Sequence, residues 1–283
     1  MCVGLIGVGR WGRHLARNFY QMGVLGALSD LHHPSLFPMV PWSQDPSALL
    51  KNKALKQIAI ATPPDTHYFF AKEALLAGRD VFVEKPLCLV LDQAEELVAL
   101  AQRQGTILMV GHLLHYHPCI PLLKKIISSG QLGEIQEVLA VRSTPHSSGT
   151  SALWDLGPHD VSLLLSLFGY PIDIFFEGGE RECRLMLAFT ASFQADIVLR
   201  TGRREQILSI VGSLAKATFS SNEVLTLTSG EIFRFEEEPL RRECEHFLEC
   251  CRTRTPPLTE GNEALEVVRV LQCAEEKRFL AFV

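Results

Sequence analysis

Short apolar runs alternate with amphipathic stretches through residues 1–115. This alternation is typical of βαβ units, in which helices join parallel strands and cover the sheet. We expect five strands, over Val3–Ile6, Val24–Ser29, Gln57–Ala61, Asp80–Val83 and Thr106–Gly111. Three helices are expected between them, over Trp11–Gln21, Thr66–Ala77 and Asp92–Gln104. The pattern therefore predicts an α/β domain with a doubly wound parallel sheet.

The ends of the third predicted helix carry local signals. Asp92 stands where an N-cap residue would bond to the free amides of the first turn, and Glu95 completes the pattern of a capping box. Gly105 can adopt the left-handed conformation that ends many helices. The sequence therefore predicts an N-cap at Asp92 and a stop at Gly105.

The pattern changes after residue 115. A helix at Pro118–Ser129 precedes a strand at Ile135–Arg142 and a helix at Trp154–Leu167. Strands then follow one another from Ile172 to Phe235. Two helices close the chain, over Leu240–Cys251 and Asn262–Phe279. We therefore expect two domains, a doubly wound one over residues 1–115 and an α+β one over residues 116–283.

One predicted strand of the second domain has apolar residues on both faces. The residues that share its first face are Leu185, Leu187, Phe189 and Phe193. The other face carries Met186, Ala188 and Thr190 rather than charges. Such a face favours an oligomer through the sheet, a homodimer or a homotetramer.

The charges exclude one class of partner. The 283 residues hold 27 Lys and Arg against 32 Asp and Glu, which gives a formal net charge of -5. No segment gathers the basic residues, whereas neutralising the phosphates of a duplex needs clustered cations. We therefore expect no nucleic-acid partner, although acidic small molecules can still bind at local sites.

The sequence predicts a cytoplasmic location. No apolar run approaches the ~18 residues of a membrane span. The start, MCVGLIGVGR, has no basic residue before its apolar stretch and no cleavage pattern, so we expect no secretory signal. Eight cysteines occur without a CxxC pair, which favours reduced thiols.

A glycine-rich loop follows the first predicted strand and precedes the first helix. The loop, Gly7-Val8-Gly9-Arg10-Trp11-Gly12, fits GxGxxG. Its glycines would serve the tight turn, the approach of the backbone to a pyrophosphate, and the packing of helix on strand. The alternative is a glycine-rich turn without a ligand. Because strand, loop and helix follow in order, we expect cofactor contacts at Gly7, Gly9, Arg10, Trp11 and Gly12.

An acidic residue ends the second predicted strand. Asp30 stands close to the expected ~20-residue offset from the loop, where an acid binds the ribose of a dinucleotide. Its carboxylate would repel a 2′-phosphate, and Leu31, His32 and His33 supply no arginine to bind one. The sequence therefore favours NAD over NADP, although a histidine at 32 or 33 could soften that preference.

Two strand ends are expected at the rim where open α/β sheets bind their ligands. One reads Val83-Glu84-Lys85-Pro86 and the other Ala61-Thr62-Pro63-Pro64. A lysine there could handle the proton of a substrate hydroxyl. Taken alone, however, Glu84-Lys85 fits an exposed strand-end pair better than a catalytic one.

Asp155 and His159 are spaced i, i+4 on a predicted helix, so both side chains can reach one substrate, whereas Asp160 falls on another face. Histidine has the pKa that suits proton transfer. The alternative is a pair of surface residues.

His112, His115 and His117 could suggest a metal site. Their segment lacks a carboxylate at ligand spacing, and hydride transfer to NAD needs no metal, so we expect none.

Six segments, in this order along the chain, closely resemble the Gfo/Idh/MocA family of NAD(P)-dependent oxidoreductases: GVGRWGRHLARNF, ATPPDTHYFFAKEALLAGRDVFVEKPL, GHLLHYHP, SGQLGEI, WDLGPHD and EPLRRECEHFLECCRTRTPPLTEG. The resemblance implies a Rossmann domain, then a domain with a large, mostly antiparallel sheet, and an active site between them. It implies catalytic roles for Lys85, Asp155 and His159, and a cis bond between Lys85 and Pro86.

The resemblance also implies the contacts of cofactor and substrate. The further cofactor contacts that it implies are Thr62, Pro63, His67, Glu84, Lys85 and His112. The substrate contacts that it implies are Lys85, Tyr116, His117, Arg142, Asp155 and His159. Arg142 could pair with a carboxylate or phosphate of the substrate, with a solvated strand-end arginine as the alternative.

Within the family, the motifs are most similar to the branch that oxidises UDP-N-acetylglucosamine and its uronic acid, often at the 3-hydroxyl. The resemblance thus implies NAD-dependent hydride transfer from a secondary alcohol of a sugar, in particular a nucleotide sugar. Two alternatives remain: a non-catalytic dinucleotide-binding regulator, and a family enzyme for a free sugar, an inositol or a non-sugar substrate. The second alternative rests on an expected shortening of the second domain, relative to many family members, between Gly169 and Arg184.

Overall fold

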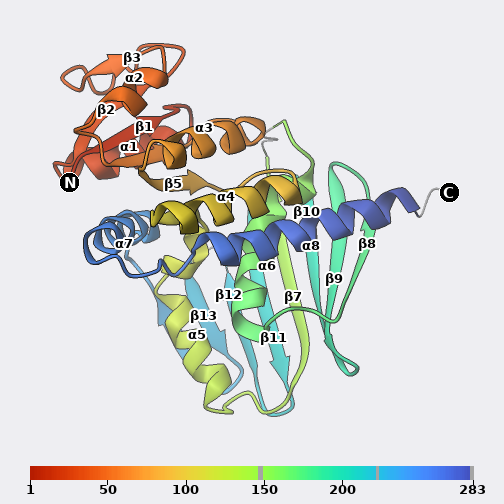
Figure 1. Ribbon diagram of the computed structural model, residues 1–283. Helices are drawn as coiled ribbons and strands as arrows, with labels where there is room; N and C mark the ends of the chain where they lie inside the picture. The colour runs from red at the N-terminus through yellow and green to blue at the C-terminus, as the bar shows by residue number, and fades with distance from the viewer. Residues whose placement is uncertain (146–148, 221–222, 281–283) are drawn as a thin grey trace. The chain divides into compact units, whose positions relative to one another are not determined.

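The structure is a computed structural model that describes residues 1–145, 149–220 and 223–280. The chain forms two compact units (Figure 1). The first consists of Met1–Leu113 together with Leu240–Val268, and the second consists of Leu114–Pro239 and the chain from Arg269 on. The N-terminal segment of the first unit therefore ends two residues before the predicted boundary at 115. The first unit also includes residues 240–268, which the sequence placed in the second domain.

The first unit is built on a six-stranded sheet. Its strands are β1 (Val3–Ile6), β2 (Leu25–Ser29), β3 (Trp42–Ser43), β4 (Gln57–Ile60), β5 (Asp80–Glu84) and β6 (Leu108–Gly111). They lie in the order β3-β2-β1-β4-β5-β6, and every pair is parallel. Every residue of β1, β4, β5 and β6 is buried, as in a sheet with both faces covered. This is the Rossmann strand order, which confirms the predicted doubly wound sheet.

Helices join these strands. They are α1 (Gly12–Gln21), α2 (Ser47–Lys51), α3 (Pro64–Leu76) and α4 (Leu91–Gln104). Gly105 ends α4 in the left-handed conformation, as predicted. The prediction of an N-cap at Asp92 was wrong: Val90 takes that position with an extended backbone and no side-chain bond. Asp92 lies inside the first turn, where its charge still favours the helix dipole.

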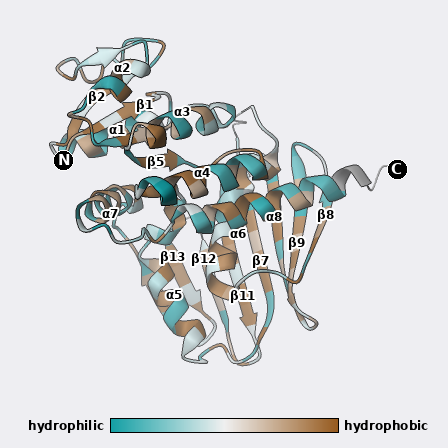
Figure 2. Cartoon of the chain, viewed as in Figure 1, coloured by the Kyte–Doolittle hydropathy of each residue, from teal (hydrophilic) through white to brown (hydrophobic). Residues whose placement is uncertain are grey.

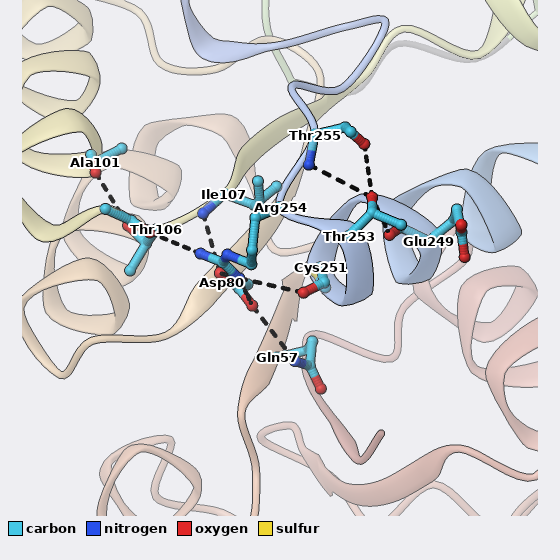
Figure 3. A network of polar contacts seen from close by, with 11 residues as sticks. Gln57, Asp80, Ala101, Thr106, Ile107, Glu249, Cys251, Thr253, Arg254 and Thr255 are labelled. Carbon is cyan, nitrogen blue, oxygen red and sulfur yellow. Dashed lines mark hydrogen bonds and ion pairs between the residues drawn. The ribbon is translucent and has the colours of Figure 1, made fainter.

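An ion-pair network built around Arg254 fixes the late segment into the first unit (Figure 3). At the start of β5, both carboxylate oxygens of Asp80 accept from Nη1 of Arg254, at 2.8 Å, and Nη2 donates to the carbonyl of Gly105 at 2.7 Å. Asp80 also accepts from the amide of Ile107 at 3.0 Å. One arginine thus ties the segment after α7 (Pro239–Thr253) to the start of β5 and to the end of α4. These are long-range contacts, which a local pattern cannot predict.

The second unit contains an eight-stranded sheet. Its strands are β7 (Ile135–Thr144), β8 (Asp173–Gly178), β9 (Glu182–Thr190), β10 (Phe193–Thr201), β11 (Glu205–Gly212), β12 (Lys216–Ser220), β13 (Val224–Leu227) and β14 (Ile232–Arg234). The order is β14-β13-β12-β11-β7-β10-β9-β8, and β7 with β10 is the parallel pair among otherwise antiparallel neighbours. The predicted α+β domain on a mostly antiparallel sheet is confirmed.

One face of this sheet forms the core of the unit. Leu185, Leu187 and Phe189 are buried on β9, as their alternation predicts. Phe193 is also buried, but the prediction that it continues the same strand was wrong, because β9 ends at Thr190 and Phe193 begins β10. The helices are α5 (Cys119–Ser128), α6 (Ala152–Phe168) and the later part of α8 (Gly261–Leu280), with a 3-10 turn at Leu113–Tyr116. In Figure 2 the helices carry both hydrophilic and hydrophobic segments, as expected for helices with one buried side. Among the described residues, no helix is both long enough and apolar enough to cross a membrane.

Candidate active site

The glycine-rich loop has room for a ligand at one glycine. Gly7 has a φ of +89°, and a Cβ there would lie 2.6 Å from the carbonyl oxygen of Ala61. A Cβ at Gly12 would lie 2.1 Å from the carbonyl oxygen of Gly7. At Gly9, by contrast, a Cβ would meet no described atom within 4 Å, and the residue is exposed. Gly7 and Gly12 thus serve the turn and the packing, while Gly9 leaves the backbone open to a pyrophosphate, which is what a dinucleotide requires.

Asp30 holds the loop from the end of β2. Its Oδ2 accepts from the amide of Val8 at 2.6 Å, and its Oδ1 accepts from the amide of His32 at 3.1 Å. A carboxylate has about four lone-pair positions, so it can accept a ribose hydroxyl as well. Arg10 and Trp11 are exposed on the loop itself.

Glu84 ends β5 beneath this loop. Its carboxylate accepts a hydrogen bond from the indole of Trp11 and one from the amide of Lys85, the latter at 3.3 Å. A side chain at Gly111 would collide with it, since a Cβ there would lie 2.9 Å from Oε2. Burial raises the pKa of Glu84 to about 7, although the Trp11 bond and the charges of Lys85 and His112 oppose the rise. Glu84 therefore gains or loses its proton near neutral pH.

Glu243 on α7 is a second buried carboxyl that the sequence did not single out. It is fully buried, and neither of its oxygens has a hydrogen-bond partner within the described ranges. Burial, followed by the charge of Glu84, raises its pKa well above the ordinary value, which favours the neutral form of this acid. The sequence does contain a signal for this buried acid, because Glu243 interrupts the apolar side of α7 between Leu240 and Phe247.

Lys85 is half-buried between the buried Glu84 and Pro86, and its bond to Pro86 is cis, as the resemblance implied. Thr62 follows β4 and accepts from the hydroxyl of Thr66 at 2.7 Å, while Pro63 is exposed. His67 is buried on α3. The first unit thus brings together the predicted loop and both predicted strand ends.

The three histidines after β6 have different partners. His112 Nδ1 lies 2.7 Å from Glu263, His115 Nε2 lies 2.6 Å from Ser162, and His117 bonds to Glu223. All three are buried, as is Tyr116. In the parts of the chain that the structure describes, they do not belong to any cluster of His, Cys, Asp or Glu able to hold a metal ion.

His117 uses both ring nitrogens within the second unit. Nδ1 accepts from the amide of Cys119 at 3.1 Å, and Nε2 faces Glu223. Its ring packs against Phe219, with 4.8 Å between the centroids. These contacts hold the start of α5, so the role in substrate binding stays a prediction.

Helix α6 carries the second predicted pair. Asp155 and His159 are both half-buried, whereas the residues between them are buried, so the two share the accessible side of the helix. Asp160, the next residue, is buried on the other side and makes a two-pronged bond with Arg142, at 2.7 and 2.9 Å. Arg142 is thus held in an ion pair, and its contact with a substrate stays a prediction.

A cavity of about 570 Å³ opens beside α6. Asp155 lines it together with Glu180, Arg181 and the threonines 144 and 201. Its size lies in the usual range for small-molecule sites, about 300 to 1,000 Å³. It combines two carboxylates, a guanidinium and hydroxyls, which are groups that bind sugars and acidic groups.

Comparisons with known proteins agree with this geometry. Residues 1–112 match the GFO_IDH_MocA model, described as an oxidoreductase family with an NAD-binding Rossmann fold. The chain is 32% identical over 150 residues to YhhX, an uncharacterized oxidoreductase of Escherichia coli, covering 50% of this chain and 44% of that protein. It is 26% identical over 257 residues to the NAD-dependent scyllo-inositol 2-dehydrogenase of Bacillus subtilis, covering 77% of this chain and 74% of that protein.

A third relative is the UDP-N-acetylglucosamine 3-dehydrogenase of Acidithiobacillus ferrooxidans. It is 29% identical over 186 residues, which cover 62% of this chain and 56% of that protein. The chain thus spans about half the length of YhhX and of this relative. A crystal structure of the same dehydrogenase superposes with a TM-score of 0.88 at 23% identity, covering 98% of this chain and 97% of that one. The fold is therefore shared throughout.

Proposed function

We propose that this chain is a member of the Gfo/Idh/MocA oxidoreductase family, whose model its residues 1–112 match, and an NAD-dependent dehydrogenase for a secondary alcohol of a nucleotide sugar of the UDP-N-acetylglucosamine type. The observation that carries the proposal is on α6. Asp155 and His159 share its accessible side, and Asp155 also lines the polar cavity. A substrate hydroxyl held by Asp155 in that cavity would lie about one helical turn from the imidazole of His159 on the same side of α6.

The residues that would hold the cofactor are those of the loop and the strand ends, with Gly9 facing the pyrophosphate and Asp30 the ribose. When bound, the dinucleotide supplies the hydride acceptor. Oxidising a CH–OH group also releases the hydroxyl proton, and a protein group must take it. We assign this proton to Lys85 and His159, either of which can act as the base. Asp155 would orient the imidazole or bind a neighbouring hydroxyl.

Cofactor and substrate preferences rest on separate residues. The carboxylate of Asp30 disfavours a 2′-phosphate, and Leu31, His32 and His33 are exposed beside it without an arginine. This supports NAD. In the cavity, Arg181 offers a cation for a phosphate or carboxylate, while Asp155 and Glu180 can accept from sugar hydroxyls. Together they support a substrate that carries both hydroxyls and an anionic group.

A substrate panel tests the proposal. The purified full chain is mixed with NAD and with UDP-N-acetylglucosamine, its uronic acid, free N-acetylglucosamine, glucose or an inositol, and NADH is followed by absorbance. We expect the highest kcat/KM with a UDP-sugar. The likeness to scyllo-inositol dehydrogenase supports one second candidate, and a preference for inositol would replace our proposal by it. Tight NADH binding without turnover on any compound would indicate a regulator instead.

We also propose that the chain forms a homodimer or homotetramer through the outer face of the eight-stranded sheet. Val198, Val141 and Ile207 are half-buried neighbours on three adjacent strands of that face. A charge in this row, as in Val141→Lys, should dissociate the oligomer, whereas Gln21→Lys at an exposed position on α1 of the first unit should not. Light scattering measures both variants, and a monomeric unmodified chain would contradict the proposal.

A further inference from the structure

His67 joins the ends of two neighbouring strands. It is buried on α3, with 1% of its surface exposed. Its Nδ1 lies 2.7 Å from the carbonyl oxygen of Pro86, two residues beyond β5. Its Nε2 lies 2.9 Å from the carbonyl oxygen of Thr62, two residues beyond β4. One imidazole thus spans the backbones at the rim where the site lies.

The imidazole of His67 faces two hydrogen-bond acceptors, one at each ring nitrogen. Both of its partners are carbonyl oxygens, which only accept hydrogen bonds, so two N–H groups would be needed to satisfy them. A neutral imidazole has one. Burial lowers the pKa of His67, and the positive charge of Lys85 lowers it further. The two carbonyls and the charge of Asp65 act in the opposite direction but do not outweigh burial. At neutral pH the ring is therefore neutral and donates to one carbonyl at a time.

The shorter contact indicates which carbonyl receives the proton. Nδ1 is 0.2 Å closer to its oxygen than Nε2 is, which favours Nδ1–H donating to Pro86. On the other side of Lys85, the Glu84 carboxylate accepts from the Lys85 amide. The backbone is therefore held by a side chain just before Lys85 and by another just after it.

We propose that His67 is a positioning residue for Lys85: as its Nδ1–H tautomer it fixes the Pro86 carbonyl, and this fixes the backbone from which the Lys85 amine reaches the substrate. The inference rests on the proposed function, because it concerns the residue to which proton transfer is assigned there. It gives His67, which is buried with both ring nitrogens on protein carbonyls, a positioning role in place of the cofactor contact that the resemblance implies.

Matched substitutions test the role. The amide nitrogen of Asn takes roughly the place of Nδ1, and that of Gln roughly the place of Nε2, so His67→Asn keeps the bond to Pro86 while His67→Gln keeps the bond to Thr62. We expect His67→Asn to retain kcat within about threefold, and His67→Gln and His67→Phe to lose about tenfold or more, with the Kd for NADH little changed. Equal kcat in the Asn and Gln variants, or an unimpaired Phe variant, would overturn the proposal.

A measurement on the unmodified protein is independent of activity. With 15N-labelled histidine, the ring nitrogen shifts distinguish the two tautomers of His67, and the spectrum of His67→Asn identifies the signal. We expect Nδ1–H with and without NADH. An Nε2–H ring would refute the proposal even if the panel finds a substrate. An Nδ1–H ring in a protein that oxidises none of the panel would refute the proposed function and leave the tautomer intact.

Discussion

Each unit places a buried carboxylate next in sequence to a proposed proton-handling residue, but the two carboxylates are neutralised differently. In the second unit, Asp160 follows His159 and has a full counter-charge in Arg142. In the first unit, Glu84 precedes Lys85 and accepts from an indole and an amide. Asp160 is thus bound by a guanidinium, whereas burial dominates at Glu84 and raises its pKa to about 7. The comparison sets a buried ion pair beside a buried acid whose pKa burial raises.

The largest expected effect concerns the neighbours of these carboxylates. Lys85→Met and His159→Asn should each lower kcat/KM by about 10²- to 10⁴-fold, because each removes a group that handles the hydroxyl proton. The Kd for NADH, measured by fluorescence, should stay within a few-fold in both. Because groups that act together are not additive, the double variant should be little slower than the slower single one. Near-normal turnover in either variant would remove that residue from the site.

The next effect tests the ion pair of the second unit. Arg142→Leu leaves Asp160 buried without its cation and should lower the free energy of unfolding by about 3 kcal/mol or more in urea. Replacing both residues by Leu should recover most of this loss. The Arg254 side chain is 48% exposed in its pair with Asp80, so Arg254→Leu should cost less. A costlier Arg254→Leu would mean that solvent exposure does not distinguish the two pairs.

The pH dependence of stability tests Glu84. Its folded pKa of about 7 exceeds the ordinary 4.5, so between these values the folded protein binds more protons than the unfolded one. Stability should therefore fall as pH rises through this window, by up to about 3 kcal/mol. Glu84→Gln keeps an oxygen for the indole and should match the parent protein near pH 4.5 but exceed its stability at pH 8. If the stabilities of the parent and the variant change with pH in parallel between pH 4.5 and 8, Glu84 does not titrate in this window and the prediction is wrong.

The smallest effect concerns Asp30, whose carboxylate is held by backbone amides. Asp30→Ala should shift the ratio of Kd values for NADPH and NADH about tenfold towards NADPH, because it removes the repulsion of a 2′-phosphate. Ser43→Ala, at the end of the neighbouring β3, serves as the control and should leave the ratio unchanged. An unchanged ratio in Asp30→Ala would show that the preference lies elsewhere.

The sequence predicted the parts of the site that are local. The loop glycines, the strand ends and the i, i+4 pair on α6 depend on residues a few positions apart, and the structure places them as expected. Partnerships between distant segments could not be predicted. Periodicity put Asp160 on a separate face from His159, but the register of β7 determines that Arg142 meets it. The pairing of Glu243 with Glu84 could not be predicted for the same reason, since only the return of α7 to the first unit brings the two residues together.

That return has a consequence for synthesis on the ribosome. The chain leaves the ribosome from its N-terminus, and domains are generally completed in that order. Here β5 and β6 emerge early, yet the arginine that binds Asp80 lies 174 residues later. Until it emerges, the buried face of Phe82 also lacks the ring of Phe247, which packs 5.7 Å away in the folded unit. The unit that begins first is therefore completed only after most of the second has been made, and its half-built sheet must avoid aggregation in the meantime.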